Sequence, residues 1–219
     1  MRSTVLLVLL AGLAGCAGLA GQSGEEPGLA DVRAKIALGR CDEGLVAGLN
    51  RYHAPELEQE AAYICLQQGE LEAVEKLLSN YATTQHNAAH ADYSVYLLAL
   101  AQQLRFDMTE DDDLARIREG RVAHQRYADF VRSYPESVYR SEVGPRLNTL
   151  FEEMASAEYR LALTTAQTGD VQGAQARMSY IVRYYPLSSA AREANDWLEE
   201  NATTEQDGTA PGTAWETGD

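Results

Sequence analysis

Two segments of this 219-residue chain follow one pattern, and each carries a proline at the same place. Phe130–Ser137 (FVRSYPES) matches Ile181–Ser188 (IVRYYPLS) at an offset of 51 residues. Proline has no amide hydrogen and clashes with the preceding turn, so it stops a helix. The repeat therefore predicts two similarly built helices that end just before Pro135 and Pro186.

Apolar residues recur every three or four positions over residues 29–201, which is the period of an amphipathic helix. The longest stripe runs from Val143 to Leu161 in steps of four and three. Gly69 and Gly169 separate neighbouring stripes, as glycine does just after a helix. Because no stretch alternates as a strand does, we predict an all-α chain of stacked antiparallel helix hairpins.

The composition limits the classes of function. The net charge is −15, and a nucleic-acid binder needs a basic surface, so we expect no nucleic-acid partner. Apolar residues make up 45% of the chain, which is enough for a packed core. Residues 201–219 combine acidic side chains with Gly, Thr and Pro and contain no basic residue, so we expect a disordered acidic tail.

The N-terminus has the pattern of a targeting segment. An apolar run of ten residues, Thr4–Leu13, is too short for a membrane span, which needs about 20 residues, and fits a signal peptide over 1–15. The next residues, ending in Ala-Gly-Cys16, resemble the lipobox of bacterial lipoproteins, whose cysteine carries diacylglycerol. Ala17, where an inner-membrane signal has Asp, implies an outer-membrane anchor by the same resemblance. The alternative is an ordinary secretory signal that contains a cysteine.

Residues 16–28 are rich in glycine and form the expected lipidated, flexible tether, followed by a helical domain over 29–200. The remaining cysteines, Cys41 and Cys65, would then lie in an oxidising compartment. If the helices on either side of residues 53–54 fold back on one another, the cysteines lie within about one turn, 5.4 Å. A disulfide is one alternative, and two buried free thiols are the other.

Small residues recur at fixed distances before the repeated prolines. Ala123 and Ala174 each stand twelve residues before a proline, and Gly169 stands seventeen before Pro186. This resembles the tetratricopeptide repeat, in which small side chains let two helices approach and a proline ends the second. We therefore expect a tetratricopeptide-like solenoid, with an acidic insertion at Asp107–Asp113 lengthening the usual repeat of about 34 residues.

The order of these features resembles the BamD/ComL family of outer-membrane lipoproteins. Ala91–Leu100 (ADYSVYLLAL) resembles the helix of its third repeat, and Phe130–Tyr139 (FVRSYPESVY) is similar to its pattern F-x-x-x-Y-P-x-S-x-Y. Arg146–Tyr159 resembles its long helix with R-L and E-Y. The resemblance covers about residues 57–197. It implies a non-catalytic scaffold, without a cofactor, in the machinery that assembles β-barrel proteins of the outer membrane.

The resemblance also implies partners: the β-barrel assembly subunit, accessory lipoproteins and unfolded outer-membrane proteins. Candidate contacts are Arg140, Arg146, Glu158 and Tyr159, on the long helix or in the turn that leads to it. The alternative for Glu158 and Tyr159 is that they only pair neighbouring repeats. The alternative function is a tetratricopeptide-like envelope lipoprotein that organises other periplasmic or peptidoglycan-associated proteins.

The chain departs from the family pattern in three places. The first repeat is expected to be shortened, because Arg40–Tyr52 leaves room for little more than one helix before Pro55. Gly144–Pro145 interrupts a helix that the family keeps unbroken, so we expect the helix to start near Gly144. Glu153 stands where family members often have a basic residue near the contact with the barrel-bearing subunit.

Other residue clusters fit metal binding or catalysis poorly. His86 and His90 are four residues apart but lack a third ligand. The acidic stretch at 107–113 has neither the spacing nor the glycine of an EF-hand, so it reads as a solvated loop. We expect Arg116, Arg118 and Arg121 to neutralise part of its charge locally. With no arrangement typical of a nucleophile or a phosphate loop, we expect neither an enzyme nor a metal site.

Overall fold

The computed structural model describes residues 27–52, 54–83 and 87–207, with side chains as far as residue 202. Within these ranges every regular element is helical, which confirms the predicted all-α fold. A 3₁₀ turn, η1 (Ser79–Ala82), follows the fourth helix. The α-helices of these ranges are α1 (Pro27–Ala37), α2 (Glu43–Tyr52), α3 (Pro55–Gln67), α4 (Leu71–Leu78), α5 (Ala91–Asp107), α6 (Asp113–Ser133), α7 (Arg140–Gln167), α8 (Val171–Tyr184) and α9 (Ser189–Asp207).

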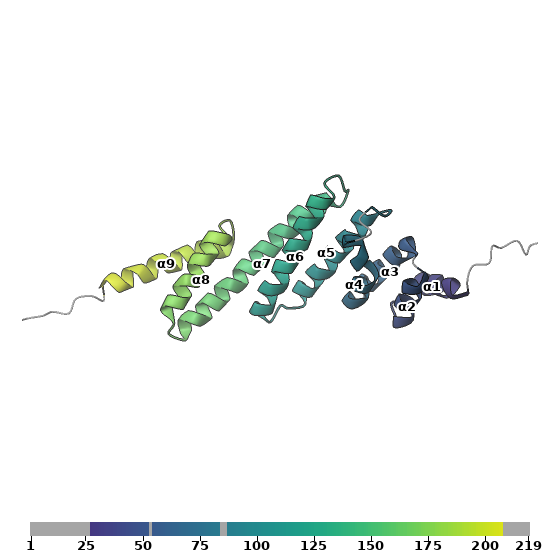
Figure 1. The fold of residues 1–219 in the computed structure, drawn as a ribbon. Helices are drawn as coiled ribbons and strands as arrows, with labels where there is room; N and C mark the ends of the chain where they lie inside the picture. Colours follow the sequence, from purple (N-terminus) through teal and green to yellow (C-terminus); the bar gives the residue numbers. More distant parts are fainter. Residues whose placement is uncertain (1–26, 53, 84–86, 208–219) are drawn as a thin grey trace, which may run out of the picture.

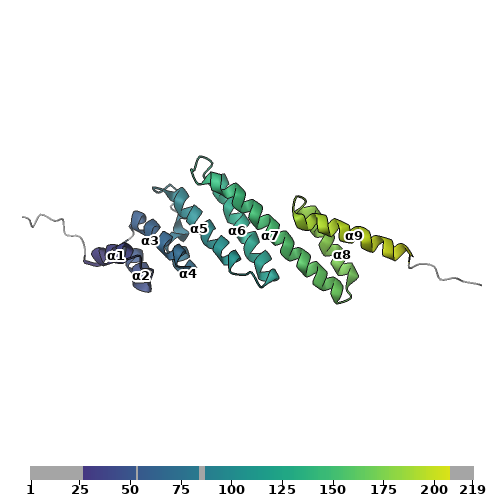
Figure 2. The same cartoon turned by 180° about the vertical axis from the view of Figure 1, so that it is seen from behind.

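The helices form one elongated row, with α1 and α9 at opposite ends (Figure 1). The view from behind shows the same order (Figure 2). Successive helices pack on one another, and contacts also join α1 to α3, α2 to α4, α3 to α5 and α7 to α9. This is the arrangement of the predicted tetratricopeptide-like solenoid, in which each helix pair contacts its neighbours.

The glycines predicted to follow helices have a left-handed backbone conformation. Gly69 (φ 76°) lies after α3, and Gly169 (φ 89°) lies after α7. Only glycine enters this region at little cost, because it has no Cβ. Asp170 then caps α8, since its Oδ1 accepts a hydrogen bond from the Gly173 amide at 2.8 Å.

The repeated prolines stand just past helix ends, which confirms the prediction made from them. Helix α6 ends at Ser133 and α8 ends at Tyr184. Ala123 and Ala174, the small residues of the two copies, are fully buried. The repeat therefore corresponds to the helix pairs α5–α6 and α7–α8.

Two apolar cores run through the row, and α5 contributes to both. Leu97 faces the first core, among α1–α5, whose buried side chains are mostly aliphatic. Tyr96 faces the second core, among α5–α9. The buried aromatic residues of that second core are Tyr96, Phe106, Tyr127, Phe130 and Tyr185.

Residues 40–52 hold one helix, α2, as predicted, and α1 lies before them and packs on α2 to form a pair. Val32 and Ile36 of α1 are buried in the first core with Leu45 and Leu49 of α2. The first helix buries just two side chains, one turn apart, so its apolar stripe in the sequence is short.

The long helix α7 begins at Arg140, not near Gly144, and Pro145 lies inside it. The proline removes one hydrogen bond, to the carbonyl of Ser141 in the first turn, and the rest of the helix keeps its ladder. The residue before a proline normally avoids the helical conformation because its Cβ meets the proline ring. Gly144 has no Cβ, so the helix passes through this position.

Helix extends past both predicted domain boundaries. Helix α1 starts at Pro27, inside the expected tether at 16–28, and α9 continues to Asp207, inside the expected tail at 201–219. Proline suits the first position of a helix, where its missing amide hydrogen has no partner to lose. The predicted signal peptide and residues 208–219 lie outside the described residues. Of the helices described, none combines the length and apolar character needed to cross a membrane.

Candidate partner-binding surfaces

Arg146, a predicted partner contact, lies in a polar network that joins α5, α6 and α7. Its guanidinium donates to Gln103 Oε1 at 3.3 Å and to Glu142 Oε2 at 3.4 Å. The hydroxyl of Tyr96 donates to Glu142 at 2.5 Å, and that of Tyr127 donates to Gln103 at 2.6 Å. The Tyr96 hydroxyl, and then Arg146, hold the pKa of Glu142 below its usual range. Arg146 is thus engaged within the fold, with 33% of its side chain exposed.

Glu158 ties α6, α7 and α8 together. Its side chain is 8% exposed and accepts from Arg121 at 3.1 Å and from Arg177 at 3.3 Å. Arg121 also donates to the Tyr180 hydroxyl at 3.1 Å. The neighbouring Tyr159 packs against the second core, and burial, followed by the acidic side chains of α9, raises its pKa. These contacts agree with the alternative in which both residues pair neighbouring repeats.

The four predicted contacts do not gather in one patch. Arg140 is exposed at the first position of α7, where its Nη1 donates to the Pro135 carbonyl at 3.3 Å. Arg146 and Glu158 are twelve residues apart on α7, about 18 Å along the axis. The structure therefore brings Glu158 and Tyr159 together and separates them from Arg140 and Arg146.

Cys41 and Cys65 are joined by a disulfide that ties the segment before α2 to α3, with the Cα atoms 5.1 Å apart. Cys16, the predicted lipidation site, lies outside the described residues, as does His86. His90 lies just before α5, exposed, with a left-handed backbone (φ 54°). Across the described part of the chain, no three His, Cys, Asp or Glu side chains gather as a metal site requires.

Burial raises the pKa of Asp107, and the charge of Arg116 opposes that rise, so the expected arginines neutralise the acidic loop before α6 in part. Asp112 caps α6 by accepting from a backbone amide at 2.9 Å, and Asp113 pairs with Arg160 of α7. Arg116 also pairs with Glu153 of α7. Arg118 pairs with Glu119 and Arg121 pairs with Glu158, and both of these carboxylates lie outside the loop. The neutralisation is only partial because α7, remote in sequence, supplies partners for Arg116, Arg121 and Asp113.

An apolar recess near the α8–α9 turn was not predicted. Phe151, Tyr184, Pro186 and Leu187 line it, and Leu187 is 96% exposed. The repeat contained the signal, because Leu187 follows its proline where the first copy has Glu136. Contiguous exposed apolar groups mark protein contacts more often than single surface residues do.

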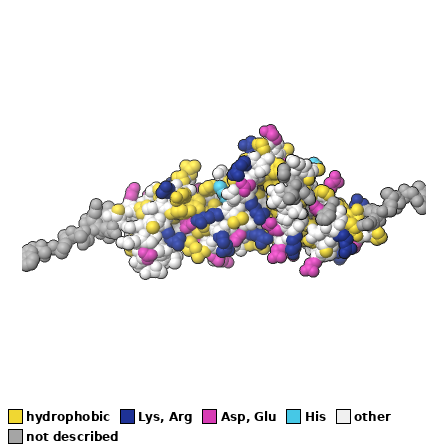
Figure 3. Space-filling view, in the orientation of Figure 1, with side chains coloured by type: hydrophobic (Ala, Val, Ile, Leu, Met, Phe, Trp, Pro, Cys, Tyr) yellow, Lys and Arg dark blue, Asp and Glu magenta, His cyan; other side chains and the backbone are white. Residues whose placement is uncertain are grey.

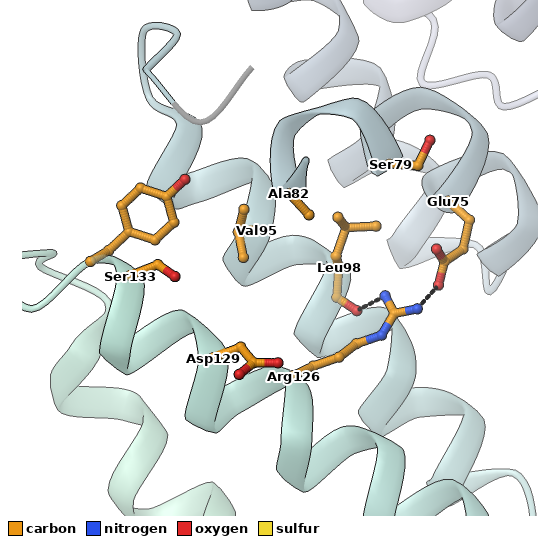
Figure 4. Close-up of a pocket in the computed structure, with 9 residues that line it drawn as sticks. Glu75, Ser79, Ala82, Val95, Leu98, Arg126, Asp129 and Ser133 are labelled. Atoms are coloured by element: carbon orange, nitrogen blue, oxygen red, sulfur yellow. Dashed lines mark hydrogen bonds and ion pairs between the residues drawn. The ribbon is translucent and has the colours of Figure 1, made fainter. Parts of the chain in front are cut away.

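Grooves lie between successive even-numbered helices, and their charge changes along the row. Four carboxylates and one lysine line the α2–α4 groove. The α4–α6 groove, of about 470 Å³, holds Glu75, Asp129 and Arg126. Arg126 reaches across it to Glu75 at 2.8 Å and to a carbonyl of α5 at 3.2 Å (Figure 4). In the α6–α8 groove, three arginines surround one carboxylate: Arg118, Arg121, Arg177 and Glu158.

Comparison with known proteins places these helices in a family. Residues 47–206, from α2 almost to the end of α9, match the family YfiO, described as "Outer membrane lipoprotein". No match was found among curated proteins. Because the family match covers more than half of the chain, the chain belongs to the YfiO family of outer membrane lipoproteins.

Proposed function

We propose that this outer membrane lipoprotein is a non-catalytic scaffold of the machinery that assembles β-barrel proteins in the outer membrane. The family supports the outer-membrane location. The proposal adds a diacylglycerol anchor on Cys16 and places the helical domain on the periplasmic face. The observation that carries it is that the family match spans the elongated stack of helix pairs, an architecture that binds other proteins along its surface.

The proposed stable partners are the β-barrel assembly subunit and accessory lipoproteins, and unfolded outer-membrane proteins are the proposed transient ones. The apolar recess around Leu187 supports a contact in the C-terminal half, because burial of exposed apolar side chains by a partner contributes much of the binding free energy. Arg140 is the proposed polar contact, because it is exposed. Arg146, Glu158 and Tyr159 would act by holding the helices that present these surfaces.

The test is recovery of the complex from detergent-solubilised outer membrane with a tagged chain. Leu187→Ser and Arg140→Glu should each lower the amount of a large β-barrel subunit that is recovered. Leu38→Ser is the matched control, since Leu38 is 68% exposed at the opposite end of the row. Recovery of peptidoglycan-associated proteins with no β-barrel subunit would contradict the proposal and favour an organising envelope lipoprotein.

The anchor has its own test. Cys16→Ala should leave the protein unlipidated, and therefore soluble in the periplasm or retained as precursor. Fractionation of the variant with the outer membrane at the parent level would contradict lipidation at Cys16.

A further inference from the structure

The N-terminal hairpin, formed by α1 and α2, is held on the helix stack by few buried side chains. Helix α1 buries two and α2 buries three, all of them aliphatic. Among the described residues, the hairpin packs on α3 and α4 alone, at one end of the row (Figure 1). The helices have 11 and 10 residues, whereas an isolated helix needs about 12–15 residues to persist in water. The hairpin therefore stays helical only while it is docked.

A disulfide fixes the point at which this hairpin meets the stack. Cys41, between α1 and α2, is bonded to Cys65 of α3. While the bond is intact, an opened hairpin still has Cys41 attached to α3, which limits the conformational freedom that the opened chain gains. Reduction removes this restraint on the open state, whose loop spans 24 positions. The redox state of one bond therefore sets how readily the hairpin leaves the stack.

The two sulfur atoms differ in their access to solvent. Cys65 is 0% exposed, whereas Cys41 is half-buried and lines the α2–α4 groove. A thiolate from solvent therefore attacks the Sγ atom of Cys41. The attack forms a mixed disulfide with Cys41 and breaks the bond to Cys65, which leaves with the electron pair and takes a proton from water. A second thiolate of the reductant then attacks the reductant sulfur, which releases Cys41 to take a proton and leaves the reductant oxidised to a disulfide.

We propose that the Cys41–Cys65 disulfide is a redox-controlled latch, opened through Cys41 by a dithiol reductant, that holds the N-terminal hairpin on the helix stack. Opening the latch removes one wall of the α2–α4 groove, which Val46, Ala47 and Asn50 of α2 supply. The groove is therefore complete only in the oxidised protein.

Opening the latch also lengthens the connection to the membrane, a consequence that rests on the proposed anchor at Cys16. Ten residues separate Cys16 from Pro27 at the start of α1, and they span at most about 35 Å. Once the hairpin has left the stack, 38 residues separate Cys16 from Pro55 at the start of α3, and they span up to about 130 Å. The redox state of the latch thus sets how far the remaining helices extend from the bilayer.

The charge of the α2–α4 groove selects the reductant. Asp42, Glu43, Glu70 and Glu72 line the groove together with Cys41 and one lysine. On the face shown in Figure 3, by contrast, basic and acidic side chains are interspersed along the row. The excess of carboxylates repels a reductant with a further negative charge and attracts one with a positive charge beside its thiolate.

Matched small thiols test this route on the oxidised full chain. Cysteamine and 3-mercaptopropionate have similar lengths and opposite charges, and intact mass measures how fast each reacts. At equal thiolate concentration, cysteamine should react about tenfold faster, and added salt should reduce the difference. Glu72→Gln should narrow it, whereas Glu110→Gln, an exposed position on the α5–α6 turn, should leave it unchanged. Equal rates for the two thiols, or a first adduct mapped to Cys65, would overturn attack through the groove.

Hydrogen exchange tests the latch itself. After reduction, the amides of α1 and α2 should exchange about 100-fold faster, and those of α8 and α9 should not change. The variant with both Cys41→Ser and Cys65→Ser should match the reduced protein, with or without reductant. Unchanged exchange in α1 and α2 after complete reduction would overturn the proposal. Equal acceleration in every helix would also overturn it, because the bond would then stabilise the whole row.

Energy transfer tests the change in reach, using the lipidated chain on vesicles that contain an acceptor lipid. A donor dye is introduced as a non-natural amino acid at Met108, which is 67% exposed on the α5–α6 turn. Transfer should fall on reduction, and the double serine variant should show the lower value in both conditions. Unchanged transfer would overturn the lengthening. Failure of the parent chain to bind vesicles would instead contradict the anchor at Cys16 and leave the hydrogen-exchange result standing, so the two proposals fail separately.

Discussion

The two ends of the helix row are stabilised by different means. Helices α1–α4 have 8–13 residues and bury mainly aliphatic side chains. Helices α5–α9 have 14–28 residues, and their core contains five buried aromatic rings. The short helices are tied by a disulfide, whereas the long ones are tied by arginine–carboxylate pairs. The two halves of one repeat architecture can thus be stabilised by different interactions, because each helix pair contacts only its neighbours.

Buried polar groups add to this difference. Near α5, the Gln59 amide donates to the carbonyls of Ala89 and His90 at 3.0 and 3.1 Å and to Ser94 Oγ at 2.9 Å. One side chain of α3 thereby fixes the turn that leads into α5. In the C-terminal part the corresponding role falls to Glu158, which is charged and joins three helices. The N-terminal helices are therefore joined by a disulfide and the neutral Gln59 side chain, with an ion pair at Lys35, whereas a buried carboxylate paired with two arginines joins α6, α7 and α8.

The largest effect is expected from opening the aromatic core. Phe130→Ala removes a fully buried ring and should lower the free energy of unfolding by about 3–5 kcal/mol. Val138→Ala, at a side chain that is 78% exposed, should change it by less than about 0.5 kcal/mol. Urea unfolding measures the loss of free energy, and hydrogen exchange of the folded protein should show reduced amide protection in α5–α9. Equal loss of protection in α1 would contradict separate stabilisation of the two ends.

The second largest loss of stability is expected from removal of the disulfide, which lies in the N-terminal part of the row. Replacing Cys41 and Cys65 with serine opens a loop that spans 24 positions and should cost about 3 kcal/mol. Hydrogen exchange should quicken in α1–α3 and remain unchanged in α8 and α9. Intact-mass analysis after alkylation without reductant checks the bond itself. Two labelled thiols in protein taken from the periplasm would show that the cysteines are free there.

Much of the fold could be predicted because helix ends have local causes. Gly69, Gly169, Pro135 and Pro186 act on the turn in which they stand, so their positions alone located the boundaries. Helix α1 was missed because it buries two side chains and so leaves little periodicity. The start of α7 was misplaced because the effect of a proline depends on the residue before it.

The partner surfaces were harder to predict, because they depend on how helices are rotated against one another. Arg121 and Arg177 stand 37 and 19 residues from Glu158, and no local pattern connects them. Spacing placed Glu158 on α7 but could not show that it faces inward. Leu187 was different, because comparison of the two repeat copies at the position after the proline already sets it apart.

A smaller loss of unfolding free energy is expected when the charge of Glu158, between α6, α7 and α8, is removed. Glu158→Gln removes the charge that balances Arg121 and Arg177, and it should cost about 2 kcal/mol because both arginines reach solvent. Asp129→Asn breaks the exposed pair with Arg132 and should cost less than about 0.5 kcal/mol. Urea unfolding measures the free energy of unfolding of both variants. Equal losses in the two variants would show that the buried position of Glu158 contributes nothing to stability.

The smallest effect should come from the cap of α2. Asp42 Oδ1 accepts from the Leu45 amide at 2.7 Å and from the Lys35 ammonium at 3.0 Å. Asp42→Ala should cost about 1 kcal/mol and Asp42→Asn only a few tenths, since the amide oxygen of Asn still caps. Asp170→Ala tests the equivalent cap of α8 and should weaken the other end of the row instead.

The cap of α2 should also depend on pH. The Leu45 amide, and then Lys35, hold the pKa of Asp42 below its ordinary value of 3.8. The unfolded chain therefore binds this proton more readily than the folded one, so the contribution is complete above about pH 3.8 and is lost as the pH falls through the lowered folded value. Unfolding midpoints of the parent and Asp42→Ala should accordingly converge in acid. A gap that stays constant with pH would show that α2 is held by contacts other than this carboxylate.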